Sequence, residues 1–297
     1  YSLMVPLTLA MFVYAYDTYK NNTIWAWVKL FIFALAAMYT HYYALLGAFW
    51  MMVLYGILLI KTSSKDEQSK SQLKRYLALG ALLVICYIPW LFELYNQLTA
   101  VGNNYWITKP DLKELVYSLQ YYFSPKHFEE PYTMFFSSSW MLIVTYSVFI
   151  LSVLIVLCGL LIKGNKEKKM VGVFALLTVI ITVSFILIFS FLSSPVFYVR
   201  YLSCYIGLYA ISCAIFMSII LENGKKWQQG IVILFFAGFL FLSGVCYYLN
   251  EVRKEKREQT QKNKKPGMTL DEYMKDTNGI MYSEEIMSPN LALLSMF

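Results

Sequence analysis

Charged residues are scarce in this sequence. Asp, Glu, Lys and Arg together make up 14% of its 297 residues, whereas they make up about a quarter of a soluble globular protein. Hydrophobic residues account for 59% of the chain and aromatic residues for 18%. This balance excludes a soluble enzyme, a nucleic-acid-binding protein and a disordered chain as the main interpretation.

Histidine is also rare, and no two cysteines lie close together in the sequence. His41 and His127 are the two histidines, and each of the five cysteines lies inside an apolar segment. A zinc site requires closely spaced Cys and His ligands, and a disulfide framework requires pairs of cysteines in watery loops. Nucleotide-binding, metalloprotease and CxxC motifs are absent as well. The sequence therefore predicts no metal ion, no cofactor and no disulfide-rich secreted module.

The hydrophobic residues form blocks about 20 residues long, the length of helix that crosses about 30 Å of hydrocarbon. Eight candidate spans lie near 1–19, 23–39, 42–60, 75–95, 138–162, 170–192, 201–221 and 229–249. The second and third form one apolar stretch with a predicted tight turn at 39–43. We therefore expect an all-α polytopic membrane protein, with about eight transmembrane helices within residues 1–249.

Lysine and arginine predict the orientation of these spans, because short cationic loops stay on the cytoplasmic side. Three short loops between spans are rich in them: 61–75, 163–169 and 222–228. The outer side then receives the turn at 39–43, the loop 96–137 and the tail from 250, although the basic start of that tail favours the opposite placement. The net charge of +7 follows from this topology, so no nucleic-acid partner is expected.

Two outer segments show local structure of their own. Thr108-Lys-Pro-Asp111 has the pattern of a capped helix start, and apolar residues follow it at helical spacing, which predicts an amphipathic helix on the membrane surface. Residues 250–297 begin as a basic linker and continue as the start of a small C-terminal α/β extracytoplasmic domain. Because the chain begins and ends in apolar runs, we expect a piece of a longer protein.

Polar side chains at membrane depth are costly, so the few that occur are candidates for function. Arg200 precedes the seventh span at its outer mouth, where it could clamp the phosphate of a lipid-linked substrate or anchor the helix at headgroup level. His41, flanked by Tyr42, could bind sugar hydroxyls or phosphate, or belong to an interfacial aromatic belt. Lys29 lies one turn inside its span and is expected to extend to the cytoplasmic surface.

Further candidates lie on the outer side. Glu93, near the outer end of the fourth span, could act as a base or ligand, or could hydrogen-bond to a neighbouring helix. Trp106 could stack on a sugar or anchor the chain at the interface. His127, Glu129 and Glu130 are close in sequence, and we interpret them as solvated loop charge.

Short aromatic motifs follow one another along nearly the whole chain. They are Tyr1-Ser-Leu3, Tyr39-Thr-His-Tyr-Tyr43, Tyr87-Ile-Pro-Trp-Leu91, Asn96-Gln-Leu98, Tyr105-Trp-Ile107 and Phe197-Tyr-Val-Arg-Tyr-Leu202. In this order they resemble the membrane region of bacterial GT-C glycosyltransferases. The resemblance is to the group similar to dolichyl-phosphate-mannose-protein mannosyltransferases and aminoarabinose transferases.

This resemblance implies transfer of a sugar from a polyprenyl-phosphate carrier to a lipid, glycan or protein acceptor, at the outer face of a bacterial plasma membrane. An acidic residue would deprotonate the acceptor hydroxyl, and cationic groups would stabilise the departing phosphate. The family carries its acidic residue after its first span, which we expect before Tyr1, so the catalytic residue is unknown. The expected substrate-binding residues are Arg200, Tyr201, His41, Tyr42, Trp106 and Glu93.

Two other functions remain open. A transporter or flippase of lipid-linked glycan, or of another substrate, would also be polytopic, but such proteins favour internal repeats and polar residues near the midplane. No internal repeat is evident, and the polar candidates lie near one face. A polysaccharide polymerase would share the outer loop and the substrate class but would consume a preassembled repeat unit.

Overall fold

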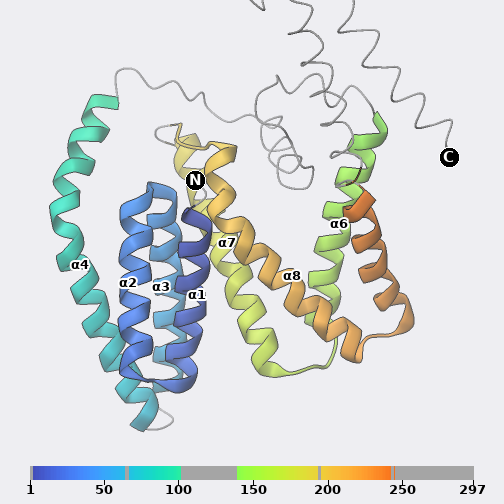
Figure 1. The fold of residues 1–297 in the computed structure, drawn as a ribbon, viewed down its shortest axis with the longest axis horizontal. Coiled ribbons are helices and arrows are strands. Elements are labelled where there is room, and N and C mark those ends of the chain that lie inside the picture. The colour runs from blue at the N-terminus through green and yellow to red at the C-terminus, as the bar shows by residue number, and fades with distance from the viewer. Residues whose placement is uncertain (1–2, 64–66, 102–138, 193–194, 242–243, 245–297) are drawn as a thin grey trace, which may run out of the picture. The chain divides into compact units, whose positions relative to one another are not determined.

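The chain folds as a set of α-helices. The computed structural model describes residues 3–63, 67–101, 139–192, 195–241 and 244, and within these ranges it contains eight α-helices, one 3-10 turn and no β-strand. The helices are α1 (Met4–Asn21), α2 (Ile24–Thr40), α3 (Tyr42–Ser63), α4 (Glu67–Val101), α6 (Ser139–Leu161), α7 (Lys166–Leu192), α8 (Ser203–Asn223) and a last helix, Lys226–Phe241 (Figure 1). The 3-10 turn η1 (Val199–Leu202) precedes α8. The all-α prediction is confirmed for these residues.

Five of these helices are long and apolar enough to cross a membrane: α3, α4, α6, α7 and α8. α2 and the last helix are apolar but shorter. This pattern indicates a membrane protein, as the composition predicts. Each of the eight segments predicted from the sequence corresponds to one helix, and the number of spans stays a prediction.

Several predictions concern residues outside the described ranges. These are Trp106, the surface helix that begins at 108, and the α/β domain within 250–297. The backbone of Arg200 lies in η1, and its side chain is not among those described.

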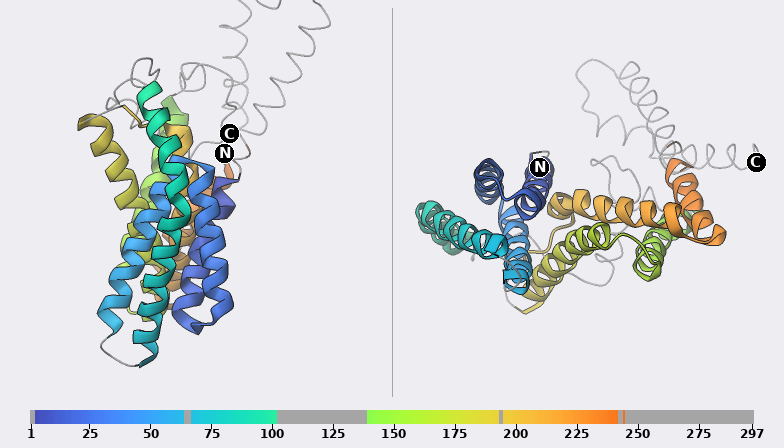
Figure 2. Two further views of the ribbon diagram at one scale, coloured as in Figure 1. Left: turned by 90° about the vertical axis from the view of Figure 1, so that its left-hand side faces the viewer. Right: turned by 90° about the horizontal axis from the view of Figure 1, so that it is seen from below.

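Successive helices run in opposite directions, so the chain returns to two ends of the helical unit (Figures 1 and 2). At one end α1 finishes and α4 and α7 begin; we call it the basic end, because Lys20, Arg75 and Lys168 lie there. At the other, the aromatic end, His41 joins α2 to α3, and η1 precedes α8. The loops predicted to share the cytoplasmic side lie together at the basic end.

The segment 61–75 is mostly helical, although the sequence favours a loop. α3 continues to Ser63 and α4 begins at Glu67. Glu67 and Lys70, one turn apart, form an ion pair at 2.6 Å, and Lys, Glu and Gln are strong helix formers. The apolar pattern therefore marks only the apolar part of each helix, and polar residues extend both helices further.

The helices form two groups that touch along a seam. α1, α2, α3 and α4 pack on one another, while α6 and α7 both pack on α8. Across the seam, α1 contacts α8 and α3 contacts α7. Figure 2, in its view from below, shows the two groups side by side. The seam brings the start of α3 close to the segment that leads into α8.

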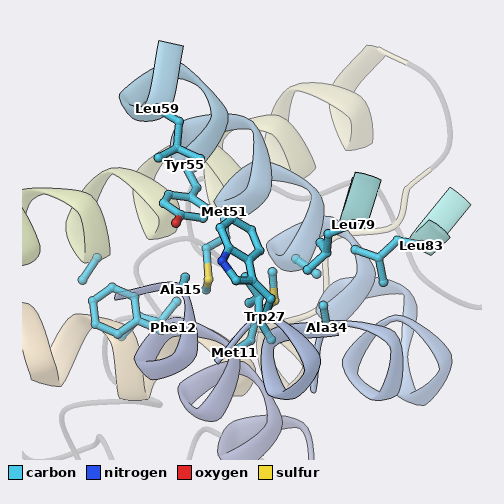
Figure 3. Close-up of a cluster of buried hydrophobic side chains, with 14 residues drawn as sticks. Met11, Phe12, Ala15, Trp27, Ala34, Met51, Tyr55, Leu59, Leu79 and Leu83 are labelled. Atoms are coloured by element: carbon cyan, nitrogen blue, oxygen red, sulfur yellow. The ribbon is translucent and has the colours of Figure 1, made fainter. Parts of the chain in front are cut away.

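Large and small side chains alternate in the core of the first group. Met11, Trp27 and Met51 are buried, and the neighbouring Ala15 lets the helix backbones approach (Figure 3). The rings of Trp27 and Tyr55 stack with their centroids 6.2 Å apart. Since lipid tails are as apolar as these side chains, close packing holds such helices together more than expulsion from water does.

Asn22 closes the turn between α1 and α2 at the basic end. Its backbone is left-handed, with φ of 50°, a conformation that Asn tolerates better than most residues. Its side-chain oxygen accepts hydrogen bonds from Trp27 Nε1 at 2.9 Å and from Arg75 Nη1 at 3.2 Å. Arg75 Nη1 also donates to the backbone oxygen of Asn22. One residue thus ties α1, α2 and α4 together.

Replacing Asn22 with Ala is expected to destabilise the protein more than replacing it with Gly. Both changes remove the acceptor for Trp27 and Arg75, which costs about 1–2 kcal/mol. Ala adds the strain of a left-handed backbone, about 1 kcal/mol or more, which Gly avoids. Unfolding in detergent, followed by circular dichroism, measures both variants. Equal losses in the two variants would show that the backbone conformation contributes nothing.

Candidate functional site

A single residue connects α2 and α3 at the aromatic end. α2 ends at Thr40, His41 is extended with φ of −166° and ψ of 147°, and α3 begins at Tyr42. The backbone N–H of Tyr43 donates to Nδ1 of His41 at 3.2 Å. Because Nδ1 accepts this bond, the neutral imidazole carries its hydrogen on Nε2.

Tyrosine rings surround the half-buried His41. Its ring centroid lies 6.2 Å from Tyr42, 5.7 Å from Tyr43 and 4.7 Å from Tyr201. Tyr201 also forms a T-shaped contact with Tyr43, with ring centroids 5.2 Å apart, and contacts Tyr198 at 5.1 Å. The fold thereby brings the turn at 39–43 into contact with the segment around Arg200 and Tyr201, almost 160 residues later in the sequence.

Burial lowers the pKa of His41 below its ordinary value of 6.5. Protonation would also turn Nδ1 into a donor facing the N–H of Tyr43. The neutral form is therefore the one that fits the folded turn.

We expect the protein to lose stability as the pH falls from about 6.5 toward the lower pKa of folded His41. The unfolded chain takes up the proton more readily in this window, so the contribution of His41 is complete above 6.5. Thermal unfolding in detergent at a series of pH values measures the effect. His41→Asn is the control, because Asn can accept the same hydrogen bond and does not titrate. If the variant shows the same slope, other groups cause the pH dependence.

The segment before η1 is held by hydroxyl groups from two helices. Ser190 Oγ, near the end of α7, accepts hydrogen bonds from the backbone N–H groups of Val196 and Phe197, at 3.0 and 3.1 Å. The hydroxyl of Tyr43, from α3, accepts from the backbone N–H of Tyr198 at 3.0 Å and donates to the carbonyl of Val196. The hydroxyl of Tyr205, from α8, donates to the carbonyl of Tyr43. These bonds set the position of η1 against α3.

A second aromatic cluster joins α2 to α4. Tyr39 contacts the rings of Tyr87 and Trp90 at 5.4 and 5.6 Å, and its hydroxyl donates to the carbonyl of Cys86 at 2.6 Å. Pro89 lies inside α4 and removes a backbone donor from this part of the helix. Pro89 has no N–H for the carbonyl of Ile85, and the Tyr39 hydroxyl binds the next carbonyl along α4, so it links α2 to α4 beside the proline.

The residues predicted to bind substrate are partly brought together. His41, Tyr42 and Tyr201 lie in one cluster, and the backbone of Arg200 is next to it in η1. Glu93 is exposed on α4, and its charge acts on the hydroxyl of Tyr42.

Sequence reasoning missed the roles of Tyr43, Tyr198 and Tyr87. Tyr43 was visible as part of the aromatic turn, but nothing local distinguishes it from Tyr42. The Tyr87 hydroxyl is buried and finds no hydrogen-bond partner among the described residues. Such a group is expensive to bury, so it marks the α2–α4 cluster as a place where another polar group fits.

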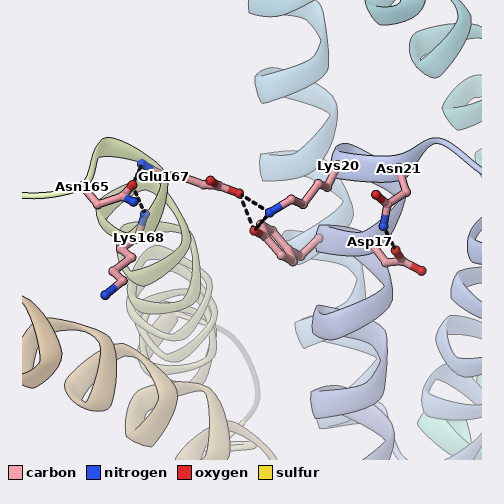
Figure 4. A network of polar contacts seen from close by, with 7 residues as sticks. Asp17, Lys20, Asn21, Asn165, Glu167 and Lys168 are labelled. Carbon is pink, nitrogen blue, oxygen red and sulfur yellow. Dashed lines mark hydrogen bonds and ion pairs between the residues drawn. The ribbon is translucent and has the colours of Figure 1, made fainter.

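The basic end holds a different network. Glu167, at the start of α7, reaches across to Lys20 on α1, with Nζ and Oε1 3.1 Å apart (Figure 4). Tyr16 donates to the same carboxylate oxygen. Both charged side chains are about half exposed, so water screens the pair and it adds little to stability. Lys29, expected to extend toward this side, has its Nζ 5.2 Å from the ring of Tyr14.

An apolar crevice of about 30 Å³ lies beside this network, between α1, α3 and α7. Its lining includes Phe12, Leu58, Met170 and Phe174. A space of this size holds about one methyl group. The two ends of the unit thus differ in chemistry: ion pairs and an apolar crevice at one, and tyrosine hydroxyls with an imidazole at the other.

Among the described residues, no group of three or more His, Cys, Asp or Glu side chains could hold a metal ion. The groups gathered at the aromatic end are hydrogen-bond donors and flat rings, which suit sugar faces, hydroxyls and phosphate oxygens. Comparison of the chain with protein-family models, with curated proteins and with solved structures gives no match.

Proposed function

We propose that this chain belongs to the membrane region of a glycosyltransferase. The enzyme would transfer a sugar from a polyprenyl-phosphate carrier to a lipid, glycan or protein acceptor at the outer face of a bacterial plasma membrane. In this proposal the eight helices all cross the membrane, and the aromatic end faces outward. The cationic side chains of the basic end support this orientation, because such residues stay cytoplasmic.

One observation carries the proposal. His41 and Tyr201, which the sequence resemblance selects from two distant motifs, lie with their ring centroids 4.7 Å apart. Arg200 is the neighbour of Tyr201 in η1. An arginine next in sequence to a cluster of an imidazole and several tyrosine rings is a suitable combination for a sugar phosphate, since these residue types offer a phosphate fork and stacking surfaces.

Each group has a role in this proposal. Arg200 binds the carrier phosphate and stabilises the charge that develops as the sugar departs. His41 donates from Nε2, and Tyr42 and Tyr201 provide faces against which a sugar ring packs. Glu93, whose charge acts on Tyr42, orients the acceptor. The base that deprotonates the acceptor is assigned to none of these residues.

The complete gene product in proteoliposomes provides the test. Polyprenyl-phosphate-linked radioactive hexoses and pentoses serve as donors, and extracted envelope lipids, glycans and proteins as acceptors. We expect labelled acceptor to form with one donor class and not with nucleotide sugars. Absence of transfer from every polyprenyl-linked donor, with a correctly folded protein, contradicts the proposal. Product size separates single-sugar transfer from polymerisation of preassembled units.

A flippase or transporter is the second candidate. At the basic end, the pair of Lys20 and Glu167 joins α1 of one helix group to α7 of the other, and both side chains are about half exposed. A protein that moves lipid-linked substrates needs helix groups that can separate. Transbilayer movement of a fluorescent polyprenyl-linked glycan, without any glycosyl product, would favour this function over the first.

A further inference from the structure

We propose that Tyr43 is a positioning residue, whose hydroxyl sets where Arg200 and Tyr201 stand relative to His41. This inference deepens the proposed function and rests on it for its effect on transfer. Tyr43 is 5% exposed, so it acts through the segment it holds and not by direct contact with substrate. The effect on the segment itself can be measured without any activity.

The hydroxyl of Tyr43 makes a two-sided contact with the segment before η1. It accepts the backbone N–H of Tyr198 at 3.0 Å and donates its own hydrogen to the carbonyl of Val196. Both partners are backbone groups, so the contact fixes the course of the chain and not a single rotamer. The described backbone reaches Arg200 two residues after Tyr198. A shift of this segment therefore also moves the backbone of Arg200, the candidate phosphate-binding residue.

The ring of Tyr43 is fixed as well. Its centroid lies 5.7 Å from that of His41 and 5.2 Å from that of Tyr201, and the two tyrosine rings are nearly T-shaped. Its backbone N–H donates to His41 Nδ1, and its carbonyl accepts the hydroxyl of Tyr205. One residue thus joins the imidazole, the Arg-Tyr segment and α8. This arrangement is what a preorganised site requires, because small misplacements of reacting groups lower rates steeply.

Ser190 holds the same segment from the other side. Its hydroxyl accepts the N–H groups of Val196 and Phe197, and the residue is fully buried in α7. The segment is therefore clamped between α3 and α7, the two helices that meet across the seam. Removal of either hydroxyl leaves backbone groups without partners and frees one side of the clamp.

Tyr43→Phe tests the proposal, with Tyr55→Phe as the matched control. Tyr55 lies on the same helix, is 1% exposed, and its hydroxyl is 2.9 Å from that of Thr18, outside the aromatic cluster. Both changes remove one buried hydroxyl. Only Tyr43→Phe releases the segment at 195–198. Ser190→Ala gives a second variant that frees the segment from α7, should Tyr43→Phe fail to fold.

The first readout is chemical labelling. Val196→Cys, in a chain whose five native cysteines are replaced by serine, reports how far the segment opens to a maleimide. We expect the labelling rate to rise about fivefold or more when Tyr43→Phe or Ser190→Ala is added, and to stay unchanged with Tyr55→Phe. Equal labelling in all variants overturns the proposal.

The second readout is transfer by the complete protein. Arg200 is proposed to bind the donor phosphate before and during transfer, so a displaced segment raises KM for the polyprenyl-linked donor about tenfold, with a smaller change in kcat. Tyr55→Phe keeps both constants. Increased labelling combined with an unchanged KM in Tyr43→Phe overturns the positioning role. If labelling increases but the unaltered protein transfers no sugar, the result supports the role of the Tyr43 and Ser190 hydroxyls in holding the segment. The same result rejects the glycosyltransferase function.

Discussion

Replacement of Arg200 with Ala in the complete protein is expected to lower sugar transfer by about a hundredfold or more. The guanidinium is proposed to stabilise the phosphate that departs from the sugar, and removal of one such donor from an active site costs about 10²–10³ in rate. Transfer from a radioactive polyprenyl-phosphate donor in proteoliposomes measures the loss. The loss should appear without a matching change in thermal stability.

Arg200→Lys separates charge from shape. Lys keeps the positive charge but lacks the planar fork that binds two phosphate oxygens at once. An intermediate rate in Arg200→Lys supports a bidentate phosphate contact. Full transfer by Arg200→Ala would falsify the phosphate role and leave Arg200 as an anchor of η1 at the headgroup level.

Gly47→Ala is expected to destabilise the protein by about 1–3 kcal/mol, the usual cost of overpacking. A Cβ at Gly47 would lie 2.6 Å from Cε1 of Tyr205. The Tyr205 ring cannot retreat easily, because it is 2% exposed and its hydroxyl donates to the carbonyl of Tyr43. The added methyl group therefore pushes α3 and α8 apart beside the aromatic cluster. Transfer should fall along with stability, since Tyr43 moves with α3.

Gly80→Ala is the control for this substitution. Gly80 also lies inside a helix, α4, but a Cβ there meets no atom within 4 Å. Ala favours helix over Gly by up to about 1 kcal/mol, so this variant should be as stable as the parent or slightly more stable. Unfolding in detergent compares the pair. A stable Gly47→Ala variant would mean that α3 and α8 can separate without cost at this point.

The helices could be predicted because apolar blocks of about 20 residues are a strong and local signal. Their ends could not, since Glu67–Arg75 form the first turns of α4 through charge and helix propensity, before its apolar span begins. The shared basic end followed from the cationic loops. Glu167 shows the limit of that reasoning. It falls within the predicted loop 163–169, and the fold places it in the first turn of α7, against Tyr16 and Lys20 on another helix.

The sequence predicts several residues of the candidate site but not which of them contact one another. The sequence singles out His41 and Arg200 because polar residues are rare among apolar ones. It cannot separate Tyr42 from Tyr43, because neighbouring helical residues point about 100° apart and the start of α3 is uncertain by more than one residue. The structure turns Tyr43 toward Tyr198 and places Tyr42 near the charge of Glu93. Contacts across 155 residues leave no trace in local spacing.

The one-residue connection at His41 bears on how the chain is made. In the proposed orientation, α2 and α3 can enter the bilayer as one hairpin whose turn leads to the outer face, while the cationic segments at its two ends stay on the side of the ribosome. A single residue, His41, forms that turn. An imidazole with an ordinary pKa of about 6.5 is mostly neutral at pH 7, so little charge has to cross the lipid there. The two helices can therefore insert together, with no charged loop between them to translocate.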